Sequence, residues 1–399
     1  MNKHLITTIK DDARQLFPSI VEVRRDLHCH PELSFKESRT SGKVKDFLSQ
    51  CGIEYTEGWA GYGIVASILG DHTGPLVMLR ADMDALPIEE ESDVPYRSVH
   101  NGVMHACGHD VHTSSLLGVA AILQKNKALI KGEVKLIFQP GEEKLPGGAS
   151  LMIREGLMEP VLPQWIVGQH VYPSLPAGQV GFRSGLYMAS ADEIFITIRG
   201  KGGHAATPHL CIDPILIASR IVVGLQDLIS RNIDPMSPAV LTIGRIYSNG
   251  GATNIIPDSV QLEGTLRAMN ETWRHDAHQW IKNFVEHTAK ASGGTAETNI
   301  MVGYPSLRND DQITELCREA AIQYLGEDKV HDLPMRMGSE DFAFYTLEIP
   351  GTFYRLGTGW EEEKLNYPVH SNRFNVDEAA LETGMGLMAY LTIKNLLTP

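Results

Sequence analysis

One thiol and three imidazoles lie within nine residues of this chain, in the stretch Met104–His112, which reads Met-His-Ala-Cys-Gly-His-Asp-Val-His. Cys107 and His109 flank Gly108, and a glycine allows the backbone angles of a short turn that could direct both side chains to one point. A thiolate and a neutral imidazole suit a borderline-soft divalent metal such as zinc. A single free cysteine is more often a small buried hydrophobe, so the pair predicts a metal site only if further ligands lie close to it.

Several further polar residues follow short β-rich segments. The segments Leu76–Arg80, Val134–Phe138 and Trp165–Gly168 alternate with helical segments such as Thr113–Lys125. This alternation predicts a mainly parallel sheet covered by helices. In such sheets ligands bind beyond the carboxyl ends of the strands. The polar residues expected there are Asp82, Asp84, Glu142, Glu143 and His170.

The candidate metal ligands are Cys107, His109, Glu143, His170 and His370. One thiolate, one carboxylate and three imidazoles can hold two divalent ions if a solvent molecule bridges them, and bridging by Cys107 itself is left open. The anionic ligands and a bridging hydroxide offset most of the charge of two dications, and the remaining positive charge favours an anionic transition state. We therefore expect two divalent metal ions per subunit, with zinc, manganese and nickel all acceptable to a mixed N/O/S donor set.

Glu142 is the candidate general base, because its neighbour Glu143 is an expected ligand and adjacent residues on a turn can point to different sides of the metals. A Glu-Glu pair alone is usually a solvated acidic turn. Here Gly141, the preceding strand and the other ligands favour the catalytic interpretation. Asp84 is expected to orient a ligand imidazole from behind, with capping of the next segment as the alternative.

The chain has 399 residues, which suggests two domains. Residues 186–302 follow the order β-α-β-β-α-β of a ferredoxin-like sandwich, and the earlier strand–helix rhythm resumes after them. We predict an α/β fold in which a mainly parallel, phosphorylase/hydrolase-like catalytic domain spans residues 1–186 and 303–399. The inserted ferredoxin-like α+β satellite domain spans residues 187–302.

The net charge of −14 argues against nucleic acid and anionic membranes as partners, and leaves an anionic small-molecule substrate possible because a local site can be positive. The five cysteines are scattered and odd in number, which fits a reducing compartment better than a disulfide framework. No signal-peptide pattern and no long apolar run is present, so the cytoplasm is the expected location.

Motifs along nearly the whole chain resemble those of one metal-dependent amidohydrolase family. This family contains N-acyl-amino-acid hydrolases, hippurate hydrolases and plant auxin-conjugate hydrolases, and it is related to aminoacylase and glutamate carboxypeptidase. The segments that carry the resemblance are Arg25–Leu33, Arg80–Pro87, Met104–His109, Phe138–Glu143, Gly168–His170, Gly200–Ala205, Asn254–Pro257, Ser339–Phe342 and Val369–Ser371. Carboxypeptidases of the wider group carry His-x-Asp where this chain has Asp82-Met83-Asp84; the acyl-amino-acid branch shares the version seen here.

The resemblance implies hydrolysis of the amide of an N-acyl or N-aroyl (hippurate-like) amino acid, by a metal-bound hydroxide with Glu142 as base. It implies the five metal ligands named above and a homodimer formed through the satellite domain. It also implies that His204, from its own or the partner subunit, stabilises the oxyanion. Asn254 and Arg267 would position the substrate, with Arg267 a candidate for binding a substrate carboxylate.

Two alternatives remain open. A dipeptidase or aminopeptidase on the same scaffold would need a carboxylate in the pocket for the free amine of its substrate. A non-enzymatic metal- or peptide-binding protein is the second alternative, and the expected base beside the expected ligands argues against it.

Overall fold

The computed structural model describes residues 2–397 and divides the chain into two compact units. Unit 1 contains the residues up to Gly185, then Arg308–Pro334, then the residues from Asp341 onward. Unit 2 contains Leu186–Leu307 and Met335–Glu340. Unit 2 therefore takes in residues beyond the expected satellite range, because the Ala189 amide donates to the carbonyl oxygens of Arg336 and Gly338 and ties that short segment to it.

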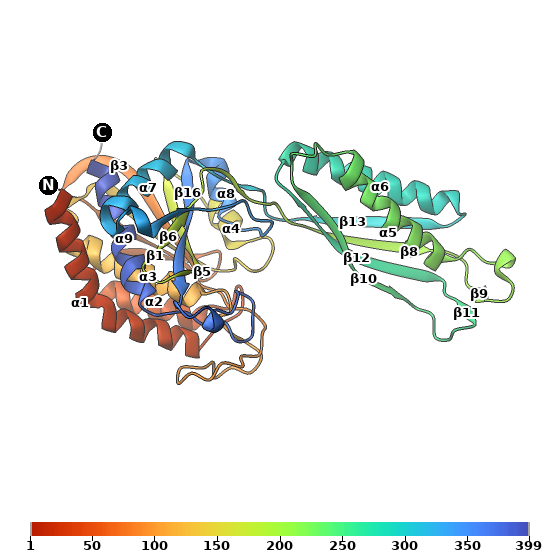
Figure 1. Cartoon of the computed structure of the whole chain (residues 1–399), viewed down its shortest axis with the longest axis horizontal. Helices are drawn as coiled ribbons and strands as arrows, with labels where there is room; N and C mark the ends of the chain where they lie inside the picture. The colour runs from red at the N-terminus through yellow and green to blue at the C-terminus, as the bar shows by residue number, and fades with distance from the viewer. Residues whose placement is uncertain (1, 398–399) are drawn as a thin grey trace. The chain divides into compact units, whose positions relative to one another are not determined.

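Unit 1 is built on an eight-stranded mixed sheet (Figure 1). In spatial order its strands are β1 (Glu54–Trp59), β2 (Gly63–Leu69), β4 (Lys131–Gln139), β3 (His72–Asp82), β5 (Ile166–Pro176), β16 (Gly351–Gly359), β6 (Val180–Phe182) and β15 (Val330–Asp332). The central strands β4, β3, β5 and β16 are parallel to one another, while β2 and β6 run antiparallel to their inner neighbours. β16 is buried along its whole length, as expected for a parallel strand covered on both faces. The predicted mainly parallel sheet is confirmed.

The long helices of unit 1 pack on one another around this sheet. They are α1 (Asn2–Cys29), α2 (Ser38–Gln50), α3 (His109–Lys125), α7 (Asp311–Leu325) and α9 (Ala380–Leu397). Two shorter helices, α4 (Gly148–Arg154) and α8 (Ala343–Glu348), contact each other. Short 3-10 turns lie at Lys127–Leu129, Glu327–Lys329 and Glu363–Leu365. α3 is buried almost throughout and contacts both α1 and α9. Within residues 2–397, no helix combines the length and apolar character that a membrane crossing requires.

Unit 2 is a four-stranded antiparallel sheet with the two helices α5 and α6 packed on it (Figure 1). The elements follow in the order β8 (Asp192–Arg199), α5 (Pro214–Arg231), β10 (Ala239–Ser248), β12 (Ser259–Ala268), α6 (Glu271–Ala291) and β13 (Thr295–Val302). The spatial order β10-β12-β8-β13 is that of a ferredoxin-like sandwich, which confirms the prediction. Its smaller elements are β9 (Gly203–His204), which pairs with β11 (Ile255–Ile256), and a 3-10 turn at Pro208–Leu210. The short strands β7 (Gly185–Met188) and β14 (Leu307–Asn309) lie where the chain passes from one unit to the other.

Local sequence explains where the helices of unit 2 begin. The Asp213 carboxylate accepts hydrogen bonds from the Ile215 and Leu216 amides, and Pro214 occupies the first turn of α5, where its missing N–H costs nothing. Asn270 caps α6 in the same way through the Trp273 amide.

Several element boundaries differ from the sequence prediction, and two of these differences affect the site directly. β5 continues to Pro176 because it stays paired with β16, so His170 lies inside a strand and not beyond its end. α3 begins at His109 and not at Thr113, because Gly108 takes the N-cap position with φ of +80°. A Cβ at Gly108 would lie 2.6 Å from a methyl group of Val171, so this close approach requires glycine.

Candidate metal centre

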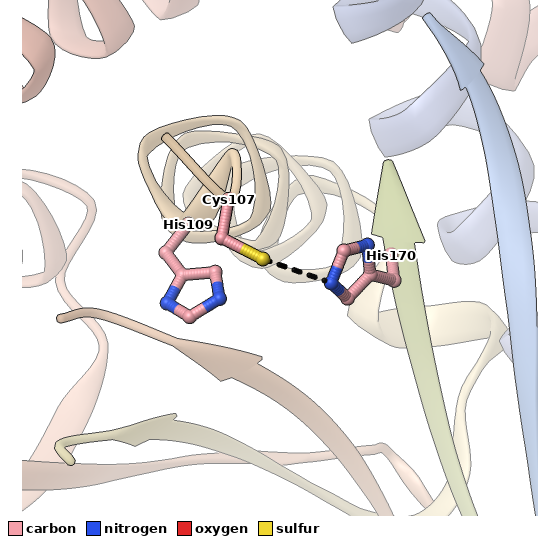
Figure 2. Close-up of side chains that lie close together, drawn as sticks. All are labelled: Cys107, His109 and His170. Atoms are coloured by element: carbon pink, nitrogen blue, oxygen red, sulfur yellow. Dashed lines mark hydrogen bonds between the residues drawn. The ribbon is translucent and has the colours of Figure 1, made fainter. Parts of the chain in front are cut away.

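The structure brings the five expected ligands together in one cluster. The donor atoms of Cys107, His109 and His170 lie within 4.8 Å of one another, and so do those of Cys107, Glu143 and His370. Figure 2 shows the Cys107 thiol and the ring of His170 facing each other, with Sγ 3.4 Å from Nε2. Glu143 Oε1 lies 3.3 Å from His370 Nε2 and 4.0 Å from His109 Nε2. Cys107 and Glu143 therefore connect the three imidazoles into one donor set.

The ligands come from four separate segments of unit 1. Cys107 and His109 flank the N-cap of α3, Glu143 follows β4, His170 lies in β5 and His370 follows β16. The His370 residue has φ of +67°, and its amide donates a 2.7 Å hydrogen bond to the carbonyl oxygen of Ala106. This bond fixes the last ligand segment to the first. The His370 side chain is 53% exposed, so solvent and substrate can reach the cluster from that side.

Hydrogen bonds on the remote ring nitrogens orient two of the imidazoles. His170 Nδ1 lies 2.8 Å from the Val171 carbonyl oxygen, and His109 Nδ1 lies 3.2 Å from Asp84 Oδ1. When Nδ1 donates its proton in this way, Nε2 is left with a lone pair for a metal. Both Nε2 atoms belong to the cluster, so the ring orientations suit ligation.

The donor set fits a borderline divalent metal. His109 Nε2 and Glu143 Oε1 are buried and make no hydrogen bond. Burial, and then the charge of Glu143, raise the pKa of the Cys107 thiol. The nearby side chains of Cys107 and then Glu143 raise the pKa of His370 to about 10. A bound dication would replace these protons and supply the charge that a buried thiolate requires, and a thiolate, a carboxylate and imidazoles are ligands that zinc accepts.

Asp84 lies directly behind the ligands. Its two carboxylate oxygens accept the amides of Glu142 (3.0 Å) and Glu143 (2.9 Å), and Oδ2 also accepts the hydroxyl of Ser34 (2.6 Å). Burial acts to raise the pKa of Asp84, but the hydrogen bond and charge of His109, together with the hydrogen bonds from Ser34 and the Glu143 amide, outweigh it and hold that pKa below its ordinary value. Asp84 thus touches both the ring of His109 and the turn that carries Glu142. The Glu142 residue is 94% buried beside the cluster.

Asp82 and His112 form a second support that the sequence analysis did not assign. Asp82 Oδ1 lies 2.6 Å from His112 Nδ1, and His112 Nε2 accepts the Val171 amide at 2.9 Å. Asp82, His109 and His112 also satisfy the distances of a metal-binding group, but both ring nitrogens of His112 already have partners. His112 therefore holds the backbone beside His170. The available signal was its spacing, because positions three apart on a helix share a face.

The three remaining predicted site residues lie in unit 2. His204 is exposed in β9, where its Nδ1 accepts the Ala206 amide at 3.0 Å. The carbonyl oxygen of Asn254 accepts the Ala205 amide, so Asn254 lies beside the end of β9, just before β11 begins. Arg267 lies on β12 and donates to the Ser339 hydroxyl at 2.8 Å. Their roles toward substrate stay predictions.

Comparison with known proteins places this cluster in a family context. The profile of peptidase family M20/M25/M40 matches residues 78–394. The chain belongs to this family. It is 40% identical over 382 residues to N-acetyl-L-cysteine deacetylase of Bacillus subtilis, covering 94% of this chain and 89% of the relative. It is also 40% identical over 393 residues to thermostable carboxypeptidase 1 of Saccharolobus solfataricus, covering 98% of each chain.

A solved structure supports the same placement. The M20-family chain matches a dinuclear metal-binding peptidase of the M20 family from Bacillus subtilis with a TM-score of 0.83 and 35% identity, covering 97% of this chain and 99% of the other. The predicted enzyme class, a metal-dependent amidohydrolase, is thereby confirmed. Divalent metals are implied by this relationship and by the cluster, while the identity of the metal stays a prediction.

Proposed function

We propose that this M20-family chain hydrolyses the amide bond of N-acyl or N-aroyl amino acids, hippurate-like compounds among them. The observation that carries the proposal is the convergence of five donor side chains with the buried carboxylate of Glu142 beside them. The relative named as an N-acetyl-L-cysteine deacetylase supports an acyl amino acid as the substrate class.

The residues of the chain divide the chemistry between them. Cys107, His109, Glu143, His170 and His370 would hold two divalent ions, zinc, manganese or nickel, which supply Lewis acidity and lower the pKa of a water molecule toward neutrality. Glu142 accepts a proton from the attacking water and returns it to the departing amine nitrogen. Asp84 binds the amides of Glu142 and Glu143, so the base and its neighbouring ligand keep a fixed spacing.

Residues of unit 2 complete the proposal. His204 stabilises the oxyanion that develops on the amide carbonyl. Asn254 positions the substrate, and Arg267 binds its carboxylate through paired N–H donors. A homodimer formed through unit 2 and a cytoplasmic location also stay predictions.

A substrate comparison tests the proposal. The purified protein is reconstituted separately with zinc, manganese and nickel, and release of free amine is measured from hippurate, from N-acetyl amino acids and from dipeptides with a free amino terminus. Turnover of the acylated compounds in preference to the dipeptides is expected. Preference for the dipeptides would establish the dipeptidase or aminopeptidase alternative. Metal-loaded protein without turnover of any substrate would support a binding protein instead.

A further inference from the structure

Three successive backbone amides of the turn that carries Glu142 donate to buried carboxylates. The Glu142 and Glu143 amides bind Asp84, and the Gly141 amide binds Glu37 Oε1 at 2.9 Å. Glu37 lies about a hundred residues earlier in the chain, and its carboxylate accepts the amides of Phe35 and Gly141, which are not proposed ligands. We infer that Glu37 is a positioning residue that sets the place of Glu142; this inference rests on the proposed function.

The side chain of Glu37 serves the turn and not its own helix. Glu37 occupies the N-cap position of α2, yet its side chain makes no capping hydrogen bond there. Oε1 accepts the Phe35 amide at 2.8 Å and the Gly141 amide, so one oxygen joins two segments. Burying a carboxyl group is costly unless it makes such bonds, and Glu37 is fully buried. Burial, and then the charge of Asp84, raise its pKa to about 7.

Side-chain packing supports the same contact between the two segments. Phe35 has φ of +62° and Gly141 has φ of +64°. A Cβ added to Gly141 would lie 2.4 Å from two carbons of the Phe35 ring. A non-glycine residue in the left-handed region persists only where its surroundings hold it there. The Ser34 hydroxyl bound to Asp84 adds a further link, so residues 34–37 hold the turn through both carboxylates.

The expected consequence is specific to the catalytic step and to the metals. Loss of the bond from the Gly141 amide would let the turn move, and a displacement of about 1 Å at a reacting group can cost about 100-fold in rate. Glu143, two residues along, is a proposed ligand, so metal affinity would fall as well. The substrate-binding residues of the proposal lie elsewhere, and KM should therefore change little.

The test compares substitutions of Glu37 in the full-length, metal-loaded protein. Glu37→Ala is expected to lower kcat and metal affinity by about 10- to 100-fold, the range typical of residues that support metal ligands. Glu37→Gln keeps an oxygen that can accept both amides, and should retain most of the kcat. Glu37→Asp keeps a carboxylate but shortens the side chain by one methylene, and should lose more activity than Glu37→Gln. Metal affinity is measured by competition with a chelating dye.

Asp310→Ala is the matched control. The Asp310 carboxylate accepts the Ile313 amide at the start of α7, so its loss removes a bond of the same kind from unit 1. A lower Tm with unchanged kcat is expected. Parent-like kcat and metal affinity in Glu37→Ala would overturn the inference. If Glu37→Ala does not fold, activity in Glu37→Asp equal to or above that in Glu37→Gln would overturn it. Metal affinity needs no turnover, so this readout stands even if the parent hydrolyses no acyl amino acid and the proposed function fails.

Discussion

At the residue scale, Glu142 and Glu143 are adjacent in sequence and are expected to do different work. The Glu143 carboxylate forms a candidate donor group with Cys107 and His370. Glu142 belongs to a different candidate donor group, with His109 and Glu143. The two amides are anchored to opposite oxygens of Asp84, which holds the backbone so that one carboxylate can ligate while the other moves a proton.

The pair Glu142→Gln and Cys107→Ala separates these two tasks. Glu142→Gln preserves size and removes the base, so kcat on an acyl amino acid should fall by about 100- to 10,000-fold with metal content unchanged. Cys107→Ala removes a ligand, so metal content measured by elemental analysis should fall together with activity. Full activity in metal-replete Glu142→Gln would remove this residue from the mechanism. Unchanged metal content in Cys107→Ala would show that the thiol is no ligand.

At the scale of single elements, β8 and α6 of unit 2 are joined by a buried ion pair. Arg274 donates to both carboxylate oxygens of Asp192, at 2.6 and 2.9 Å, and His278 Nε2 lies 2.7 Å from the same carboxylate. The Asp192 side chain is fully buried. Burial opposes ionisation, but the hydrogen bonds from Arg274 and His278 outweigh it and lower the pKa of Asp192 to about 2.

This lowered pKa predicts how the stability of unit 2 depends on acidity. The folded-state pKa of Asp192 lies below its ordinary value of 3.8. The ionised Asp192 carboxylate therefore contributes fully to the free energy of unfolding above about pH 4, and this contribution is lost as the pH falls toward 2. It amounts to roughly 2 kcal/mol. Asp192→Asn should destabilise unit 2 at neutral pH and flatten its acid dependence between pH 4 and 2. Hydrogen exchange of the α6 amides measures this acid dependence of stability. Asp227→Asn, at an exposed position of α5, is the control. Equal acid dependence in the parent and in Asp192→Asn would contradict the prediction.

At the scale of the whole molecule, all five proposed ligands belong to unit 1, on both sides of the segment that forms unit 2. Each unit also has its own hydrophobic core. A metal bound at this cluster therefore joins chain segments that are far apart in sequence but lie within one unit. Its stabilising effect should be confined to that unit.

Metal removal tests this localisation. A ligand present at a hundred times its Kd stabilises the folded state by about 2.7 kcal/mol. Chelation should lower the Tm of the unfolding of unit 1 and speed hydrogen exchange in α3 and β5, while exchange in α5 and α6 stays as before. Restoring the metal should reverse the change. Equal acceleration in both units, or none in unit 1, would place the metal elsewhere.

Short-range patterns in the sequence were enough to determine the fold class and the chemical types at the site. Strand and helix periodicity predicted the mainly parallel sheet and the ferredoxin-like unit, because burial of one face imposes those periods locally. The placement of Asp84, Glu143 and His170 after predicted strands indicated that their segments converge, since parallel strands end at one edge of a sheet.

Only the tertiary structure decided which partner each polar group takes. The role of His112 could not be predicted from the sequence, because the Val171 amide, from a strand, occupies its second ring nitrogen only in the folded chain. The extension of β5 past His170 depends on its pairing with β16, nearly two hundred residues away. Glu37 has no local pattern that connects it to Gly141. Such hydrogen bonds form between groups that folding brings together from distant segments, and their partners have no periodic signature in the sequence.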